Sequence, residues 1–173
     1  RTLVEASAPA LGLEVLPVLA RSLAEACRAR HAFVAELVDD GRTCRIQALW
    51  SDGGWKAGRE YAPVSSPCRH TLLATGCHSA AWPGAFGLDA RHYLGLALRD
   101  ARGRACGVLV LLADQAVDDH PSLQALLTVA AARCASELQR VNAEHSLALG
   151  YRLERGLAAC ARTLLADQHP PRS

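Results

Sequence analysis

The sequence predicts an α+β fold in which a mixed domain of antiparallel strands and helices is followed by a long C-terminal helix. Tight-turn signals at 39–42 and 52–54 separate stretches that have the alternating pattern of β-strands. From about Asp118 to about Asp167 the residues are typical of a nearly unbroken helix. A helix of about 45 residues extends about 70 Å, so we expect part of it to meet a surface outside the preceding domain.

Composition limits the classes of function. The 173 residues suit one domain plus an extension, and a chain that begins at Arg1 and contains no Met leads us to expect a fragment of a longer protein. The net charge of +2 and the scattered arginines predict no nucleic-acid surface. No apolar run reaches the length of about 18 residues that predicts a membrane span. Seven cysteines without a CxxC pair favour reduced thiols in a cytoplasmic protein over a disulfide framework.

The first half of the chain predicts a helix followed by a three-stranded antiparallel meander. The expected elements are a helix at 11–30 and strands at 31–38, 43–51 and 55–62. In the second strand Ile46, Ala48 and Trp50 are expected to share one face, because side chains alternate along a strand. The third strand is the most polar, which predicts an outer position in the sheet.

The second half predicts a crossover and then a hairpin. The expected elements are a helix at 68–75, a short strand at 77–81 and strands at 92–99 and 104–113. Ser66 and Pro67 precede the short helix as a cap and a helix-starting residue. The stretch 106–112 is apolar on both faces, so the sheet needs cover on both sides. The terminal helices can cover one side and the segment 67–91 the other.

Four short motifs fall in order along these elements. They are Ala32-Phe33-Val34-Ala35-Glu36-Leu37, Ser66-Pro67-Cys68, Tyr93-Leu94-Gly95-Leu96-Ala97-Leu98 and Gly103-Arg104-Ala105-Cys106-Gly107-Val108-Leu109. Their order and spacing resemble the GAF domain family of bacterial signalling proteins from about Leu13 to Arg140. The last two look like the family's hairpin pattern, Y-x-G-x-P-L and then G-x-x-x-G-x-L, with Ala97 where the family usually has proline.

The resemblance implies an antiparallel sheet of five or six strands, with terminal helices on one face and a ligand pocket on the other. It implies a GAF-like sensor domain at 11–140 and a linker helix at 141–173 that leads into a downstream output domain. Members of the family bind cyclic nucleotides, bilins, haem or small metabolites, many have no known ligand, and they usually dimerise through their terminal helices. The fold does not select among these ligands, so the cofactor stays unknown.

The side chains expected to line such a pocket are mostly large aromatics. The candidate ligand-binding residues are Trp50, Tyr61, Cys68, His78, Trp82, Phe86 and Tyr93. The aromatic rings offer stacking surface for a planar ligand. The alternative is that they fill a core that has few other large side chains.

One local cluster has metal-like or redox chemistry. Cys68, His70, Cys77 and His78 supply two thiols and two imidazoles, the ligand types that zinc or haem iron takes. The spacing is tight, however, and His78 is expected on the strand face opposite Cys77. Cys68 falls in the first turn of a helix, where a thiolate is favoured, so a redox-sensing thiol is the alternative to a small buried packing residue. The Cys77-His78 pair lies too early in the chain for the bilin attachment of phytochrome-type GAF domains.

No catalytic motif is present in the sequence. The patterns GxSxG, HExxH, GxGxxG and the P-loop are missing, and Asp118-Asp119-His120 is better interpreted as the start of the long helix. We therefore expect a domain that is not an enzyme.

The long helix has apolar residues at spacings of three and four, first from Leu123 to Leu149 and then, after a break in register, at Leu153, Leu157, Cys160 and Leu164. This spacing favours a parallel homodimer, with packing against the same chain as the alternative. We expect a regulatory domain of a sensor kinase or transcription activator that senses a small molecule and passes the signal along this helix. The alternatives are a ligand-free dimerisation spacer and a Cys/His redox or metal sensor.

Overall fold

A seven-stranded antiparallel sheet forms the centre of the structure, a computed structural model that describes residues 14–118 and 120–167. The strand order is β3-β2-β1-β7-β6-β5, and β4 also pairs with β2. The strands are β1 (His31–Val38), β2 (Thr43–Ser51), β3 (Gly54–Lys56), β4 (Glu60–Tyr61), β5 (Cys77–Ala81), β6 (His92–Arg99) and β7 (Ala105–Ala113). The α-helices are α1 (Val15–Ala26), α2 (Cys68–Leu73) and α3 (Pro121–Asp167), and the short 3-10 helices are η1 (Asp39–Gly41), η2 (Pro63–Ser65) and η3 (Ala85–Gly87). The predicted α+β class is confirmed.

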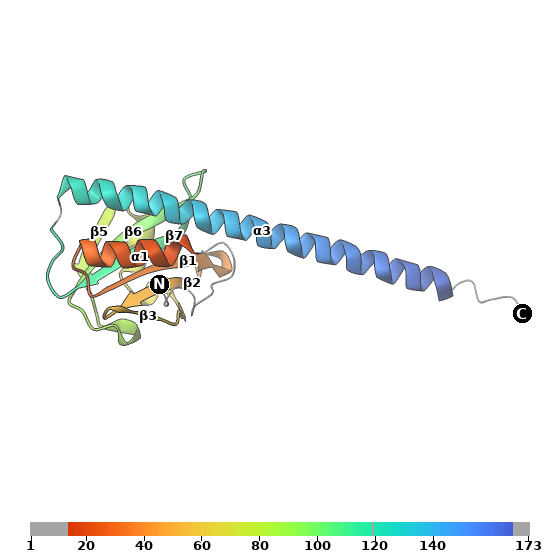
Figure 1. Ribbon diagram of the computed structural model, residues 1–173, viewed down its shortest axis with the longest axis horizontal. Helices are drawn as coiled ribbons and strands as arrows, with labels where there is room; N and C mark the ends of the chain where they lie inside the picture. The colour runs from red at the N-terminus through yellow and green to blue at the C-terminus, as the bar shows by residue number, and fades with distance from the viewer. Residues whose placement is uncertain (1–13, 119, 168–173) are drawn as a thin grey trace, which may run out of the picture. The chain divides into compact units, whose positions relative to one another are not determined.

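One face of the sheet, which we call the helix face, is covered by α1 and the first part of α3 (Figure 1). Aliphatic side chains make this layer: Leu16, Ala20 and Leu23 of α1 pack into the same cluster as Leu127 and Leu138 of α3. The cover that the apolar strand at 106–112 requires on this side is thus supplied by both terminal helices, as predicted.

Helix α1 ends earlier than the predicted boundary at residue 30, and residues 11–13 of the prediction lie outside the described residues. The amide of Ala29 donates to the carbonyl of Ala24 (2.9 Å), and that of Arg28 donates to Glu25 (3.4 Å). With Arg28 at φ 50, this is the bonding pattern of a Schellman motif. The helix stops here although arginine replaces the glycine that usually signals such an end.

A bulge in β2 decides which residues face the helices. Val34 of β1 pairs with Ala48, but the next residue, Ala35, pairs with Ile46, so Gln47 is an extra residue in β2. Ala48 and Trp50 therefore pack on the helix face while Ile46 packs on the opposite face. The prediction that all three share one face is wrong for Ile46, because the bulge resets the alternation.

The outer strand predicted at 55–62 is divided into β3 and β4. Both pieces keep the same register against β2, and the amide of Ile46 still donates to the carbonyl of Arg59 (2.9 Å). Between them the chain runs so close to β2 that a Cβ at Gly58 would overlap the Ile46 carbonyl oxygen. This division brings the sheet to seven strands, against the five or six expected.

The other face of the sheet, which we call the crossover face, is covered by the segment between β4 and β6. Helix α2 occupies part of it and ends two residues before the predicted boundary at 75. The stretch from Gly84 to Gly87 has positive φ at Gly84 (73°), Phe86 (63°) and Gly87 (69°). The indole Nε1–H of Trp82 donates to the carbonyl of Leu88 (2.8 Å) and holds this stretch against the sheet.

Helix α3 begins at Pro121, three residues after the predicted start, and the glycines at 150 and 156 do not interrupt it. The chain divides into two units, one ending at Gln139 and the other beginning at Arg140. In the second unit the side chains of 142–166 are exposed. Within the described residues, none of the helices combines the length and apolar character needed to cross a membrane.

Candidate functional site

Buried hydroxyl and thiol groups lie at the centre of the crossover face. The Tyr93 hydroxyl is 2.6 Å from Thr71 Oγ1, and the Tyr61 hydroxyl is 3.2 Å from Cys68 Sγ. The Tyr93 hydroxyl also donates to Cys68 Sγ at 3.5 Å. These side chains come from β6, α2 and β4, so the cluster connects the crossover segment to the sheet.

Burial determines the ionisation of this cluster. It raises the pKa of Tyr61 and of Tyr93, and the nearby Cys68 adds to both shifts. Burial also raises the pKa of Cys44, which lies across from Tyr61, to about 11. The two phenols and the Cys44 thiol are therefore neutral hydrogen-bonding groups at neutral pH.

Aromatic rings surround these polar groups. Trp82 stacks on Tyr93 with ring centroids 5.9 Å apart and planes 8° from parallel. Phe86 packs on Tyr61 (4.5 Å) and against Trp82 (5.7 Å), and His78 approaches Tyr93 (6.2 Å). The rings fill the space where they meet, because each is packed on at least one other ring.

The spacing Tyr93-x-Gly95 in the hairpin has a direct physical reason. The Tyr93 ring folds over the position two residues along its own strand, and a Cβ at Gly95 would overlap both the Tyr93 hydroxyl and Thr71 Oγ1. Glycine at this position leaves room for the hydrogen bond between Tyr93 and Thr71. The motif that carries the sequence resemblance is thus part of the polar cluster.

The structure brings together six of the seven predicted ligand-binding residues on the crossover face: Tyr61, Cys68, His78, Trp82, Phe86 and Tyr93. Trp50 is placed on the helix face instead, as a consequence of the bulge in β2. There it packs edge-on against Trp55 (4.9 Å), and the guanidinium of Arg21 lies 5.2 Å above its ring.

The Cys/His cluster does not converge on one point. The rings of His70 and His78 lie 5.7 Å apart, but Cys77 packs with the helix-face core and Cys68 is fully buried between the two tyrosines. Among residues 14–118 and 120–167, no three His, Cys, Asp or Glu side chains are grouped so that they could hold a metal ion. None of the seven cysteines, all of which lie within the described residues, forms a disulfide.

A cavity of about 370 Å³ opens beside the aromatic cluster, between β2, the two pieces of the outer strand and η3. We call it the β3–β4 cavity. Its lining residues are Ile46, Leu49, Ser51, Asp52, Lys56, Ala57, Arg59, Phe86, Gly87 and Leu88. Of these, only Phe86 was predicted as a site residue. Lys56 and Arg59 were missed because a polar outer strand is usually solvent-facing. The sequence offers one signal for them, two cations on either side of Ala57-Gly58.

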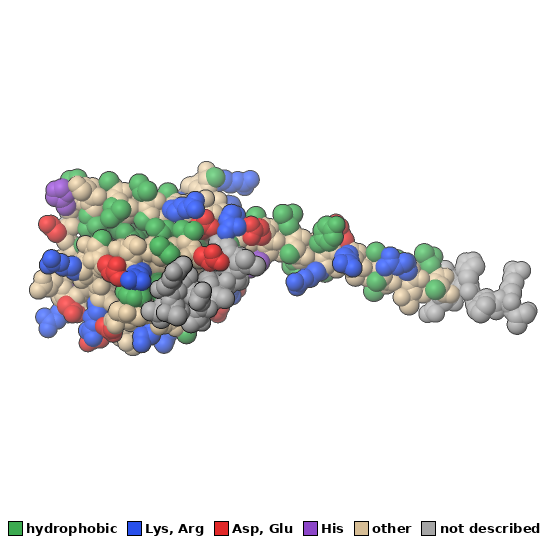
Figure 2. Space-filling view, viewed as in Figure 1, with side chains coloured by type: hydrophobic (Ala, Val, Ile, Leu, Met, Phe, Trp, Pro, Cys, Tyr) green, Lys and Arg blue, Asp and Glu red, His purple; other side chains and the backbone are tan. Residues whose placement is uncertain are grey.

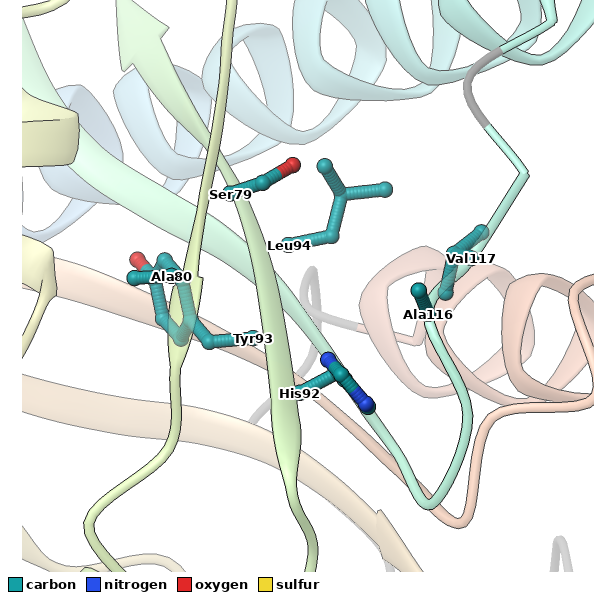
Figure 3. A pocket seen from close by; sticks show the side chains of 7 residues that line it. All are labelled: Ser79, Ala80, His92, Tyr93, Leu94, Ala116 and Val117. Carbon is teal, nitrogen blue, oxygen red and sulfur yellow. The ribbon is translucent and has the colours of Figure 1, made fainter.

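A second cavity, of about 250 Å³, lies near the start of α3. Figure 3 shows Ser79 and Leu94 on one side of it and Ala116 and Val117, from the connection that leads to α3, on the other. His92, the first residue of β6, also lines this cavity. Its polar side chains are those of Ser79, His92 and Tyr93, and its lining includes no Lys or Arg.

No family model matches this sequence, and no curated protein does. Among solved structures, the GAF domain of an Acinetobacter phosphoenolpyruvate-protein phosphotransferase matches with a TM-score of 0.61 at 12% identity, over 84% of this chain and 91% of that one. Residues 122 to 287 of a methyl-accepting chemotaxis protein match with a TM-score of 0.60 at 12% identity, over 82% and 95%. A type II free methionine-R-sulfoxide reductase from Thermoplasma acidophilum matches with a TM-score of 0.59 at 14% identity, over 80% and 96%. The fold of this chain is therefore that of the GAF domains.

Proposed function

We propose that the chain is the regulatory sensor domain of a bacterial signal-transduction protein, with a ligand-binding crossover face and a signal that leaves through α3. The observation that carries this proposal is that β7 contacts both layers. Leu109 and Leu111 of this strand pack with α1 and α3, while Val108 and Val110 pack with the aromatic cluster. A displacement of the cluster therefore reaches α3 through a single layer of backbone.

The proposed ligand-binding residues are the six that the crossover face gathers: Tyr61, Cys68, His78, Trp82, Phe86 and Tyr93. The strained backbone supports this choice, because Phe86 has φ 63°, a conformation that bulky side chains rarely adopt. Strain of this kind concentrates at functional sites. For a ligand to signal, it must bind two arrangements of the cluster with different affinity.

We also propose that α3 forms a parallel homodimer, and the structure supplies a reason for the break in its apolar register. Leu127, Cys134 and Leu138 of the first apolar run are buried against the sheet of the same chain. A different set of positions, spaced by three and four from 122 to 164, is exposed apart from the half-buried Gln139. This dimer seam consists of Ser122, Ala125, Val129, Ala132, Ser136, Gln139, Ala143, Ser146, Gly150, Leu153, Leu157, Cys160 and Leu164.

The seam follows one heptad register through the whole helix, small in its first half and rich in leucine in its second. Figure 2 shows apolar side chains at the surface of α3. Leu153 is 59% exposed, Leu157 71% and Leu164 65%, which is unusual for three leucines in one register. A second copy of the same helix would cover them.

Oxidative cross-linking tests the dimer, because a parallel in-register pair places the exposed Cys160 opposite its own copy. We expect mild oxidation to produce a disulfide-linked dimer on a non-reducing gel, and Cys160→Ser to abolish it. Cys106→Ser, which removes a half-buried thiol of β7, is the matched control and should leave the product unchanged. A monomer in sedimentation, or cross-linking that survives Cys160→Ser, contradicts the proposed dimer.

A ligand-free dimerisation spacer is the second candidate, and one observation favours it. The rings of Tyr61, Trp82, Phe86 and Tyr93 pack on one another, which fills the centre of the crossover face. A spacer would dimerise as the sensor does, but its α3 would not respond to changes on the crossover face.

A further inference from the structure

We infer that the β3–β4 cavity binds a small organic anion whose apolar body lies against Phe86 and Leu88 and whose acidic group meets Lys56 and Arg59. This inference rests on the proposed sensor function, because it names the class of ligand that the crossover face receives. The cavity shares Phe86 with the aromatic cluster, so an occupant would touch a residue of that cluster directly.

The size and apolar lining of the cavity fit a small molecule. Its volume of about 370 Å³ falls within the range of small-molecule sites. Four apolar side chains are among its lining residues: Ile46 and Leu49 of β2, Phe86 of η3, and Leu88. An aromatic or aliphatic body against these side chains would be partly removed from water.

The charges at the cavity favour an anion. The part of the chain that the structure describes contains no ion pair of the Arg59 guanidinium. Lys56 has Asp52 as its charged neighbour, but the Asp52 carboxylate is already held by the Arg30 guanidinium at 2.6 Å. That hydrogen bond lowers the pKa of Asp52, so the carboxylate remains ionised and engaged with Arg30. The cavity is thus lined by two cationic side chains, Lys56 and Arg59, and by one carboxylate, Asp52, that is already paired with Arg30. Such cations bind carboxylate or phosphate groups.

Two segments that line the cavity depart from regular structure. The outer strand is interrupted between Lys56 and Glu60, and Ala57 and Arg59 of this interruption line the cavity. Phe86 has a left-handed backbone conformation with φ 63°. Backbone strain of this kind concentrates at functional sites.

Two other cavities in the described part of the chain are less suited to an anion. The lining of the cavity in Figure 3 includes no Lys or Arg, and its polar side chains are those of Ser79, His92 and Tyr93. A third, of about 280 Å³ between β6 and α3, includes Arg99, whose guanidinium already donates to the carbonyls of Gly103 and Ala74. We therefore expect an acidic ligand to bind in the β3–β4 cavity and not in either of these two cavities.

Anilinonaphthalene sulfonate, an aromatic body with one anionic group, is the probe for this inference. We expect it to bind with one-to-one stoichiometry, and Arg59→Gln to raise its Kd on the order of tenfold. The uncharged phenylnaphthylamine should bind wild type and Arg59→Gln alike. Arg102→Gln, an exposed arginine in the turn between β6 and β7, is the matched control and should leave the Kd unchanged.

A second variant blocks the cavity without altering charge. Ala57→Trp should abolish probe binding by filling the space, while Ala101→Trp, in the exposed β6–β7 turn, should not. Far-UV circular dichroism confirms that each variant is folded. Absence of saturable binding to wild type, an equal Kd in Arg59→Gln and Arg102→Gln, or binding that survives in folded Ala57→Trp overturns the inference. Cross-linking at Cys160 does not depend on the cavity, so failure here is distinguishable from failure of the proposed dimer.

Discussion

The two faces of the sheet differ in the kind of side chain that packs them. The helix face is packed mainly by aliphatic side chains of the terminal helices and the sheet, with Leu16 of α1 and Leu111 of β7 almost completely buried. The crossover face is packed by aromatic rings whose hydroxyls meet Cys68 and Thr71, under a segment with three positive φ angles between 84 and 87. Aliphatic packing has few alternative arrangements, whereas a hydrogen-bonded aromatic cluster beside a cavity can be rearranged by a ligand. On this comparison the helix face is suited to passing a signal to α3, and the crossover face is suited to binding a ligand.

The largest effect is expected on the helix face. Leu111→Ala removes a side chain that is 1% exposed and leaves a cavity between β7 and the helices, which should lower the free energy of unfolding by about 3 kcal/mol. Urea denaturation measures this loss. Leu73→Ala, which truncates a leucine that is 79% exposed, is the control and should change stability by less than about 0.5 kcal/mol.

On the crossover face, Gly95→Ala should displace the Tyr93 ring, because the new methyl group would overlap its hydroxyl. We expect a loss of about 2 kcal/mol and a change in near-UV circular dichroism, since Trp82 stacks on that ring. Adding Tyr93→Leu removes the nearer of the two overlaps and leaves the one with Thr71. The double variant should therefore lose less stability than the sum of the two single changes, and strict additivity would show that the overlap is absent.

Alkaline pH should affect the Cys44 thiol of the crossover face. Its pKa is raised from 9.0 to about 11 by burial, so the stability that it contributes is complete below pH 9.0 and lost as pH rises through about 11. At about pH 10, Cys44→Ala should remove about 1 kcal/mol of the pH-dependent loss of stability. The measurement is the urea midpoint of both proteins across that range, and identical slopes would contradict burial of the thiol.

The smallest effect belongs to Trp50, the aromatic that lies apart from the cluster. Arg21→Gln removes the cation above its ring and should cost about 0.5 kcal/mol, because the arginine is half-exposed. Tryptophan fluorescence during unfolding reports the change, and Arg152→Gln in the exposed part of α3 is the control. A loss as large as that of Gly95→Ala would remove the contrast between the two faces.

The order of elements could be predicted because turn residues and apolar alternation are local signals. The turn at Asp52-Gly53 has positive φ at both residues, as the sequence indicated, and the apolar strand at 106–112 is covered on both sides. The bulge at Gln47 gave no such signal, and it moved Trp50 away from the other candidate residues. The β3–β4 cavity depends on η3 packing across from the outer strand, a contact between distant parts of the chain that no local pattern encodes.

The most direct test of the proposed relay is the rate of Cys160 disulfide formation in wild type and in Gly95→Ala, measured where both are fully folded. Gly95 lies in β6 and Cys160 in the second half of α3, and the proposed relay connects them through the sheet and α3. The proposed relay predicts that displacing the Tyr93 ring changes the rate. Equal rates in the two proteins would contradict it and leave the dimerisation spacer as the function of this domain.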